Sequence, residues 1–390
     1  MWAALAKLAT VLSLAVAGPA LADGKTSLPT RLADTLEGFR DRHGFPGATA
    51  AIVLPDGTVA TAATGLADIE ENRAMTPGTR MLAASIGKTF VAATILSLES
   101  EGLLSQSDLL AEFLGDRAWF ADLPNVRTIT IKHLLHHQSG LPDHTHLVEF
   151  QKAAAAQIAS GVRAITPEEL LAFVTGRRPL FKAGTSWAYS DTGYVLLGLV
   201  IEEVTGRRYY DVVGETFLTP LDLSDTIPAD RPHLPGLAVG YTIPDNAYGL
   251  PVRTAEADGR LVWDPTVEWT GGGFVSTSSD LARWGHALFA GQAMKAPYLD
   301  RLLDGVPVSP ATPDILYGAG VAISAQTPLG PVYGHGGWIP AYVSSLRHYA
   351  DHRVTVAFQI NSDAGVIDGG SDHVAELETA LARLAIEGLE

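Results

Sequence analysis

The chain has 390 residues, of which 47% are hydrophobic and 18% are charged, and its formal net charge is −16 at pH 7. This composition supports a folded protein with a sizeable core and excludes an intrinsically disordered chain. The negative charge repels phosphate backbones, so nucleic acid is not expected as a partner. No cysteine is present, which excludes disulfides, thiol catalysis and thiolate metal sites.

Residues 1–22 have the features of a secretory signal peptide. Lys7 gives a positive start, residues 8–17 form an apolar stretch, and Ala20-Leu21-Ala22 matches the small-x-small cleavage pattern. The apolar stretch is shorter than the ~20 residues that a membrane-spanning helix needs. The sequence therefore predicts a mature chain of residues 23–390 that is periplasmic or secreted, with no integral membrane segment after cleavage.

The first half of that mature chain is predicted to begin with a helix over residues 30–43. Runs of β-forming residues at 47–54 and 58–64 flank the turn-forming Pro55-Asp56-Gly57, which predicts a hairpin. The middle of the chain is predicted to be mostly helices and loops. Helices are expected over residues 85–99, 167–174 and 192–204, and from residue 278. Prolines punctuate residues 228–265, which favours a surface loop or a cleft wall.

The C-terminal part returns to strands. Candidate strands are residues 316–323, 332–334, 342–349 and 354–360, and a last helix is expected over 372–386. Strands at both ends and helices between them predict an α+β fold, in which an antiparallel sheet is flanked by helices. We expect a sheet subdomain of about 23–84 and 286–390, with a helical subdomain of about 85–285 inserted.

Ser85 and Lys88 form the first candidate catalytic pair. They stand three residues apart at a predicted helix start and therefore lie on one face. A desolvated lysine can act as the base that a nucleophilic serine needs. Taken alone, the pattern is equally typical of a capped helix with a solvated lysine.

Tyr189 is the second candidate, because a tyrosine beside a lysine ammonium loses its proton more easily and can act as general base and acid. The third is His335-Gly336-Gly337 at a predicted strand end, where glycines let a substrate backbone approach the strand. The backbone N–H of Trp338 can then pair with that of Ser85 as an oxyanion hole. Each segment alone also fits a purely structural role.

The order and spacing of these segments resemble the serine β-lactamase and DD-peptidase family. That family carries Ser-x-x-Lys, then Tyr-x-Asn, then Lys-Thr-Gly or His-x-Gly. Residues 128–142, 189–206 and 271–284 are also similar to segments of that family. The resemblance covers about residues 30–385 and implies the β-lactamase/transpeptidase-like fold, with the site between sheet and helical region.

The resemblance also implies a role for each candidate. It assigns acylation to Ser85, proton transfer to Lys88 and Tyr189, the oxyanion hole to Ser85 and Trp338, and substrate binding to Asp191, His335, Gly336 and Gly337. Asp191 departs from the usual asparagine, and an ionised aspartate only accepts hydrogen bonds. It is expected either to pair with Lys88, which keeps the lysine charged, or to bind a substrate ammonium. His335 stands where other members carry a lysine that faces a substrate carboxylate, and His-Gly-Gly points away from dedicated β-lactamases.

The predicted function is hydrolysis of peptides that contain D-residues, through an acyl-enzyme, as in a DD-carboxypeptidase or a D-aminopeptidase. The alternatives are a carboxylesterase or β-lactamase that uses the same residues, and a non-catalytic peptidoglycan- or penicillin-binding protein. A small peptide or ester is the expected partner, the oligomeric state stays open, and no metal or organic cofactor is expected. The spacing of His133 and His137 suits a metal pair, but no third ligand accompanies it.

Overall fold

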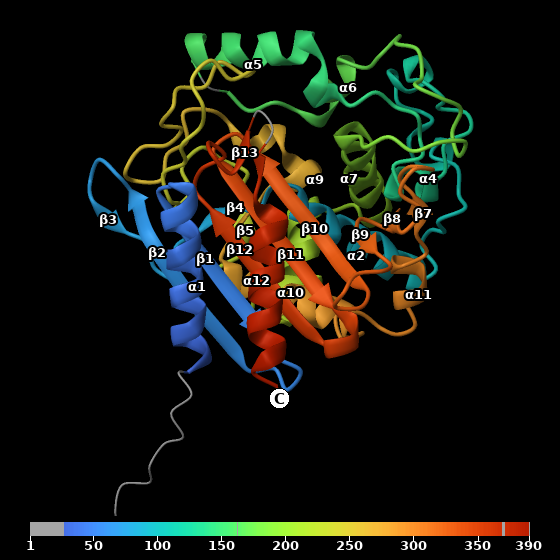
Figure 1. Cartoon of the computed structure of the whole chain (residues 1–390). Coiled ribbons are helices and arrows are strands. Elements are labelled where there is room, and N and C mark those ends of the chain that lie inside the picture. Colours follow the sequence, from blue (N-terminus) through green and yellow to red (C-terminus); the bar gives the residue numbers. More distant parts are fainter. Residues whose placement is uncertain (1–26, 162, 369–370, 390) are drawn as a thin grey trace, which may run out of the picture.

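The computed structural model describes residues 27–161, 163–368 and 371–389 (Figure 1). The predicted signal peptide lies outside these residues. Among the residues described, no helix has both the length and the apolar character needed to cross a membrane.

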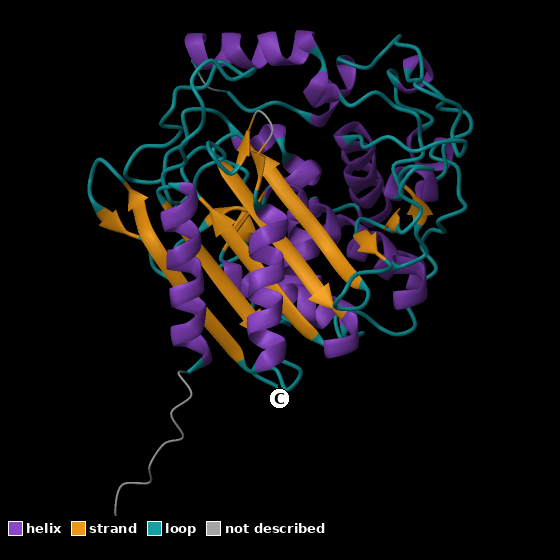
Figure 2. Ribbon diagram, in the orientation of Figure 1, coloured by secondary structure: helices purple, strands orange, loops and turns teal. Residues whose placement is uncertain are grey.

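Within the described chain, an antiparallel sheet of nine strands joins the two ends of the sequence (Figure 2). Ala48 pairs with Ile360, so β1 lies directly beside β12 and closes the sheet between the ends. The strand order is β3 (Arg73–Ala74), β2 (Val59–Asp68), β1 (Gly47–Val53), β12 (Val354–Ile360), β11 (Tyr342–Tyr349), β10 (Val332–Ile339), β9 (Ala322–Ser324), β8 (Ile315–Tyr317) and β7 (Val306–Pro307).

Helices cover both faces of this sheet. On one face, α1 (Leu28–His43) and α12 (Val374–Glu387) lie side by side and bury a shared apolar stripe against β1, β2 and β12 (Figure 1). On the other face, α10 (Ser278–Phe289) packs against β1, β11 and β12. Gly44 ends α1 because it adopts a left-handed conformation, with φ of 74°, that glycine tolerates best.

The inserted region is built around α7 (Asp191–Thr205), whose first ten residues after Asp191 are buried on nearly every side. Its neighbours in that region are α2 (Lys88–Ser100), α3 (Ala111–Leu114), α4 (Ile131–Leu135), α5 (Val148–Ser160), α6 (Pro167–Ala172), α8 (Tyr209–Val213) and α9 (Trp269–Gly272). A small sheet of β4 (Met81–Leu82), β6 (Phe274–Ser276) and β5 (Ile227–Pro228) underlies it. The remaining α-helix is α11 (Leu299–Leu302), and the remaining strands form the hairpin of β13 (Ile367–Asp368) and β14 (Ser371–Asp372).

The predicted α+β fold is confirmed, whereas several predicted elements have different bounds. Residues 316–323 do not form one strand, because Gly318 and Gly320 turn the chain back between β8 and β9. The strand predicted over 332–334 continues to Ile339, since β11 pairs with it along its whole length. Ser85 lies in a 3-10 turn, Ala84–Gly87, and the α-helix begins only at Lys88.

Candidate active site

Ser85 sits on a turn that its neighbours hold in an unusual backbone conformation. The preceding residue, Ala84, has a φ of +47°, which L-residues rarely adopt. Ala83 fixes the start of the turn: its N–H donates to Phe274 O at 2.9 Å, and its carbonyl accepts from the Ser344 hydroxyl at 2.8 Å. The nucleophile candidate is therefore positioned by β6 on one side and β11 on the other.

Lys88 is completely buried beneath this serine. Its Nζ lies 3.1 Å from Ser85 Oγ, donates to Gly271 O and forms an ion pair with Asp191. Burial lowers the pKa of Lys88, but the negative charge of Asp191, together with Tyr189 and the hydrogen bonds from both residues, outweighs burial and leaves that pKa above its ordinary value. Of the two roles foreseen for Asp191, the structure shows the pairing that keeps Lys88 charged.

Tyr189 stacks against the same lysine, with its ring centroid 4.9 Å from Lys88 Nζ. Burial raises the pKa of the Tyr189 hydroxyl, and the lysine charge only partly opposes this. His137 holds the segment in place: its ring lies 4.2 Å from the Tyr189 ring, and its Nδ1 accepts from the N–H of Ser190 at 3.2 Å. In the resting site both Tyr189 and Lys88 are therefore protonated.

The opposite side of the site is the strand β10. Beyond Gly334 this strand pairs with β11 alone, which leaves its other edge without a strand partner among the described residues. A Cβ on Gly337 would meet Ala83 O at 2.4 Å, so only glycine lets β10 approach the Ser85 turn this closely. Trp338 follows directly and is 43% exposed, as expected for a residue at the mouth of a cleft.

His335 is buried and its ring nitrogens are occupied. Nε2 lies 2.9 Å from the Tyr317 hydroxyl, and Nδ1 lies beside the carbonyl of Gly336. Burial, helped by the charge of Lys88, lowers the pKa of His335 to about 3. The imidazole is therefore neutral at physiological pH and does not replace the positive charge that other family members place here.

One cavity of ≈ 460 Å³ brings these residues together. It is lined by the predicted site residues Ser85, Tyr189, Asp191, His335, Gly336, Gly337 and Trp338, and Lys88 lies beneath its floor. Tyr248, Leu250 and Trp263 from the proline-rich segment also line it, which fits the predicted cleft wall.

Glu268 lines the same cavity, although no sequence motif predicted it as a site residue. A Cβ built on Gly272 would lie 2.8 Å from Glu268 Oε2 and 2.5 Å from the carbonyl carbon of Ala84, so this carboxyl group lies beside the Ser85 turn. Burial and the nearby charge of Asp191 raise its pKa to about 8. Glu268 immediately precedes the Trp-Thr-Gly-Gly-Gly segment, and its position there is the only sequence signal that marks it.

The histidines that suggested a metal pair have separate partners instead. His133 Nδ1 accepts from Thr130 N–H at 3.2 Å and caps α4. Both ring nitrogens of His136 lie 2.9 Å from backbone carbonyls, and His144 Nδ1 lies 3.0 Å from the Thr192 hydroxyl. Together with His137 against Tyr189, these contacts give the histidines of this segment structural roles.

A serine turn, a buried lysine and a buried tyrosine, placed between an antiparallel sheet and an inserted helical region, define a penicillin-recognising type of site. The family described as Beta-lactamase matches residues 32–381, and the chain belongs to that family.

Three proteins illustrate the relationship. The chain is 28% identical over 306 residues to penicillin-binding protein 4* of Bacillus subtilis, covering 77% of this chain and 64% of that protein. It is 27% identical over 340 residues to a D-aminopeptidase of Cereibacter sphaeroides, covering 85% and 59%. A D-stereospecific amidohydrolase from Streptomyces sp. has a similar structure, with a TM-score of 0.74 and 29% identity over 86% of this chain and 94% of that one. The chain thus spans about three fifths of the length of the curated relatives.

Proposed function

We propose that this chain is a serine hydrolase that forms an acyl-enzyme on Ser85 and cleaves amide bonds next to a D-residue whose amino group is free. One observation carries the proposal: the cavity beside Ser85 holds the carboxyl group of Glu268, which has no cationic partner among the described residues. The names of the D-aminopeptidase and the D-stereospecific amidohydrolase support the same substrate class.

The charges around the cavity favour an ammonium over a carboxylate. Lys88 is already paired with Asp191, and Arg347 forms an ion pair with Glu378, with Nε 3.1 Å from Oε1. His335 is neutral. A substrate carboxylate would therefore meet no unpaired cation from these groups. A substrate ammonium would lie beside the carboxyl group of Glu268, which is protonated at pH 7 in the free protein and ionises when an adjacent cation lowers its pKa. This argues for an aminopeptidase or amidase rather than a DD-carboxypeptidase.

The geometry supports an ordinary acyl-transfer sequence. Ser85 Oγ attacks the carbonyl carbon, and Lys88 accepts the hydroxyl proton as it passes one of its own to Asp191. The pKa of Asp191 is raised by burial, which suits it to hold that proton. In this proposal the N–H groups of Ser85 and Trp338 stabilise the developing oxyanion, as the family resemblance implies, and Tyr189 protonates the leaving amine. Water then releases the acyl group.

The test gives the purified chain five compounds: D-phenylalanine amide, its N-acetyl derivative, an acetylated peptide that ends in D-Ala-D-Ala, a p-nitrophenyl ester and penicillin. Ser85→Ala is the blank, and mass spectrometry of quenched reactions detects the acyl-enzyme. We expect Ser85-dependent turnover that is fastest on the free amine. Turnover confined to the D-Ala-D-Ala peptide would indicate a carboxypeptidase, and turnover of p-nitrophenyl esters alone would indicate a carboxylesterase. Stable acylation by penicillin without turnover of any substrate would indicate a binding protein.

We further infer that the chain is exported to the periplasm or the medium, on the evidence of the signal-peptide features in residues 1–22. Expression of the whole chain in a Gram-negative host tests this. We expect the extracytoplasmic fraction to contain a protein whose N-terminus is near Asp23. An uncleaved protein that stays in the cytoplasm would contradict it.

A further inference from the structure

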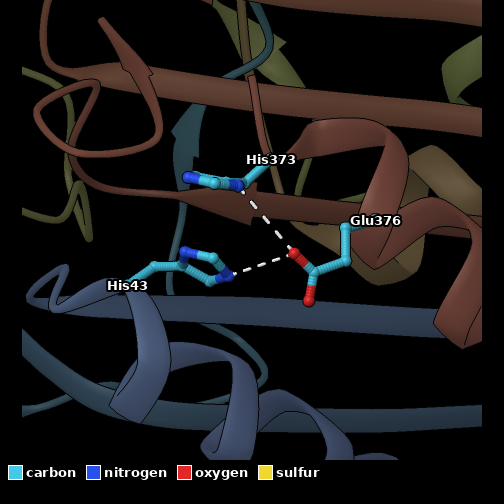
Figure 3. Close-up of side chains that lie close together, drawn as sticks. All are labelled: His43, His373 and Glu376. Atoms are coloured by element: carbon cyan, nitrogen blue, oxygen red, sulfur yellow. Dashed lines mark ion pairs between the residues drawn. The ribbon is translucent and has the colours of Figure 1, made fainter. Parts of the chain in front are cut away.

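A second group of chemically active side chains lies where the C-terminal end of α1 meets the start of α12. His43 is the last residue of α1, His373 immediately precedes α12, and Glu376 lies in the first turn of α12. Candidate donor atoms of the three residues all lie within 4.8 Å of one another. Figure 3 shows both imidazole rings directed at the carboxylate of Glu376. We propose that these three residues bind a divalent transition-metal ion, with Zn²⁺ the best match.

The donor set and its dimensions fit such an ion. Two imidazoles and one carboxylate are ligands that Zn²⁺ commonly takes, and three protein ligands leave a position for water. Ligand atoms around a tetrahedral Zn²⁺ with bonds of about 2.0–2.1 Å lie roughly 3.3 Å apart. His43 Nε2 lies 3.2 Å from Glu376 Oε2, and His373 Nδ1 lies 3.8 Å from the same oxygen. Small side-chain rotations would bring the set to these dimensions.

The arrangement is hard to explain as ordinary ion pairing. The two imidazole rings lie 3.9 Å apart between centroids, and both turn a nitrogen toward one carboxylate oxygen. His43 Nε2 is buried, and no described residue other than Glu376 offers it a partner. A metal ion would give both rings and the carboxylate one shared partner.

The neighbouring side chains hold the ligands in position. Arg42 Nη2 donates a hydrogen bond to Glu376 Oε1 at 2.8 Å, which leaves Oε2 free to face the histidines. Phe39 packs against the His43 ring with centroids 4.4 Å apart. Such support of ligand side chains by surrounding groups is typical of metal sites.

A metal here would brace one wall of the active-site cavity. His373 is followed at once by Val374, which lines that cavity. On the other side, a Cβ on Gly365 would lie 3.3 Å from the carbonyl of His43, so the segment before β13 packs on the same residue. Because α1 and α12 come from opposite ends of the sequence, one ion would connect them across the face of the sheet (Figure 1).

The test uses the purified whole chain without an affinity tag, stripped with EDTA and titrated with Zn²⁺ by calorimetry and with Co²⁺ by visible absorption. We expect Zn²⁺ and Co²⁺ to bind saturably, with one site per chain at the cluster. His43→Gln and His373→Gln should each weaken the affinity of that site by about tenfold or more. The control is His233→Gln, since His233 also faces a carboxylate, that of Asp258 at 4.0 Å, but has no second histidine in that pair. We expect this variant to bind like the wild type.

Hydrogen exchange locates the site independently of affinity. Zn²⁺ should slow exchange in peptides that cover residues 38–46 and 371–378, and it should raise the Tm of the wild type more than that of His373→Gln. If His43→Gln fails to fold, His373→Gln still decides the question, because the His373 side chain is one-third exposed at 33% and its loss leaves the core intact. Absence of saturable binding, or equal affinity in wild type and His373→Gln, would overturn the proposal.

Discussion

The two walls of the active-site cavity work by opposite means. The wall formed by the Ser85 turn, α7 and the residue before α9 carries the charged pair Lys88 and Asp191 and the carboxyl group of Glu268, whose pKa is about 8. The wall formed by β10 carries a neutral histidine and two glycines. The first wall can change the protonation state of catalytic groups and attract a charged part of the substrate. The second wall acts mainly by bringing the backbone of β10 close to the substrate. Substitutions on each wall should therefore fail in different ways.

The largest expected effect is on the charged wall. Lys88→Met leaves the Asp191 carboxylate buried without its partner, which is expected to cost about 3–5 kcal/mol of unfolding free energy. Hydrolysis should fall by roughly 1,000-fold or more, because Ser85 loses its proton acceptor. Urea unfolding and steady-state rates measure the two losses.

The double variant Lys88→Met/Asp191→Asn separates those two losses. It removes both charges, so most of the stability should return while hydrolysis stays low. If the double variant is no more stable than Lys88→Met, the ion pair does not account for the instability.

On the glycine wall the expected damage is to geometry. A methyl group on Gly337 would collide with Ala83 O, pushing β10 away from the Ser85 turn. We expect Gly337→Ala to lower kcat/KM by about 100-fold, since displacements of about 1 Å cost that much. At Gly336 the nearest atom to a new Cβ is the Arg347 guanidinium at 3.7 Å. Gly336→Ala should therefore cause a clearly smaller loss, and equal losses would show that strand approach is not the limiting factor.

The same contrast explains what could be predicted from the sequence. Local spacing in the sequence is enough to identify the motifs that contain Ser85, Lys88, Tyr189 and the His335 segment. It is also enough to predict the strands at 342–349 and 354–360. Glu268 stands in no such spacing, because its effect arises from burial beside Asp191, which is 77 residues away along the chain. The charge state of Lys88 likewise depends on a partner that only the fold supplies.

The largest gap between sequence and structure lies at the two ends of the chain. His43 and His373 are 330 residues apart, and no local pattern links them. Pairing of β1 with β12 places α1 beside α12 and brings these side chains together. The sequence predicted that both ends share one sheet, but the pairing register and helix placement that create the cluster follow from packing.

Asp191→Asn tests whether the Asp191 carboxylate sets the protonation state of Lys88. The Asp191 charge holds the pKa of Lys88 above its ordinary value, so a neutral asparagine lets burial lower that pKa. Neutral Lys88 would then exist at lower pH, and the acidic limb of the pH profile of kcat/KM should move to lower pH by about one unit or more. Because a neutral Lys88 can take the Ser85 proton without passing one of its own to Asp191, the rate at the optimum should stay within about tenfold of wild type. A profile that does not move would show that Asp191 does not control the essential base.

The last expected effect is the pH dependence of stability that Glu268 imposes. Its pKa in the folded chain is about 8, above the ordinary value of 4.5, so between these values the folded state holds a proton that the unfolded state has lost. This contribution is complete below the lower value and is lost as the pH rises through about 8. Stability of the wild type should therefore fall, relative to Glu268→Gln, on the order of 3 kcal/mol from about pH 5 to about pH 8. Urea midpoints of both proteins across this range measure the difference in stability. The contribution of the histidines is the same in both proteins and cancels in that difference. Parallel curves would mean that the pKa of Glu268 in the folded chain stays close to its ordinary value, so that burial does not keep this carboxyl group protonated.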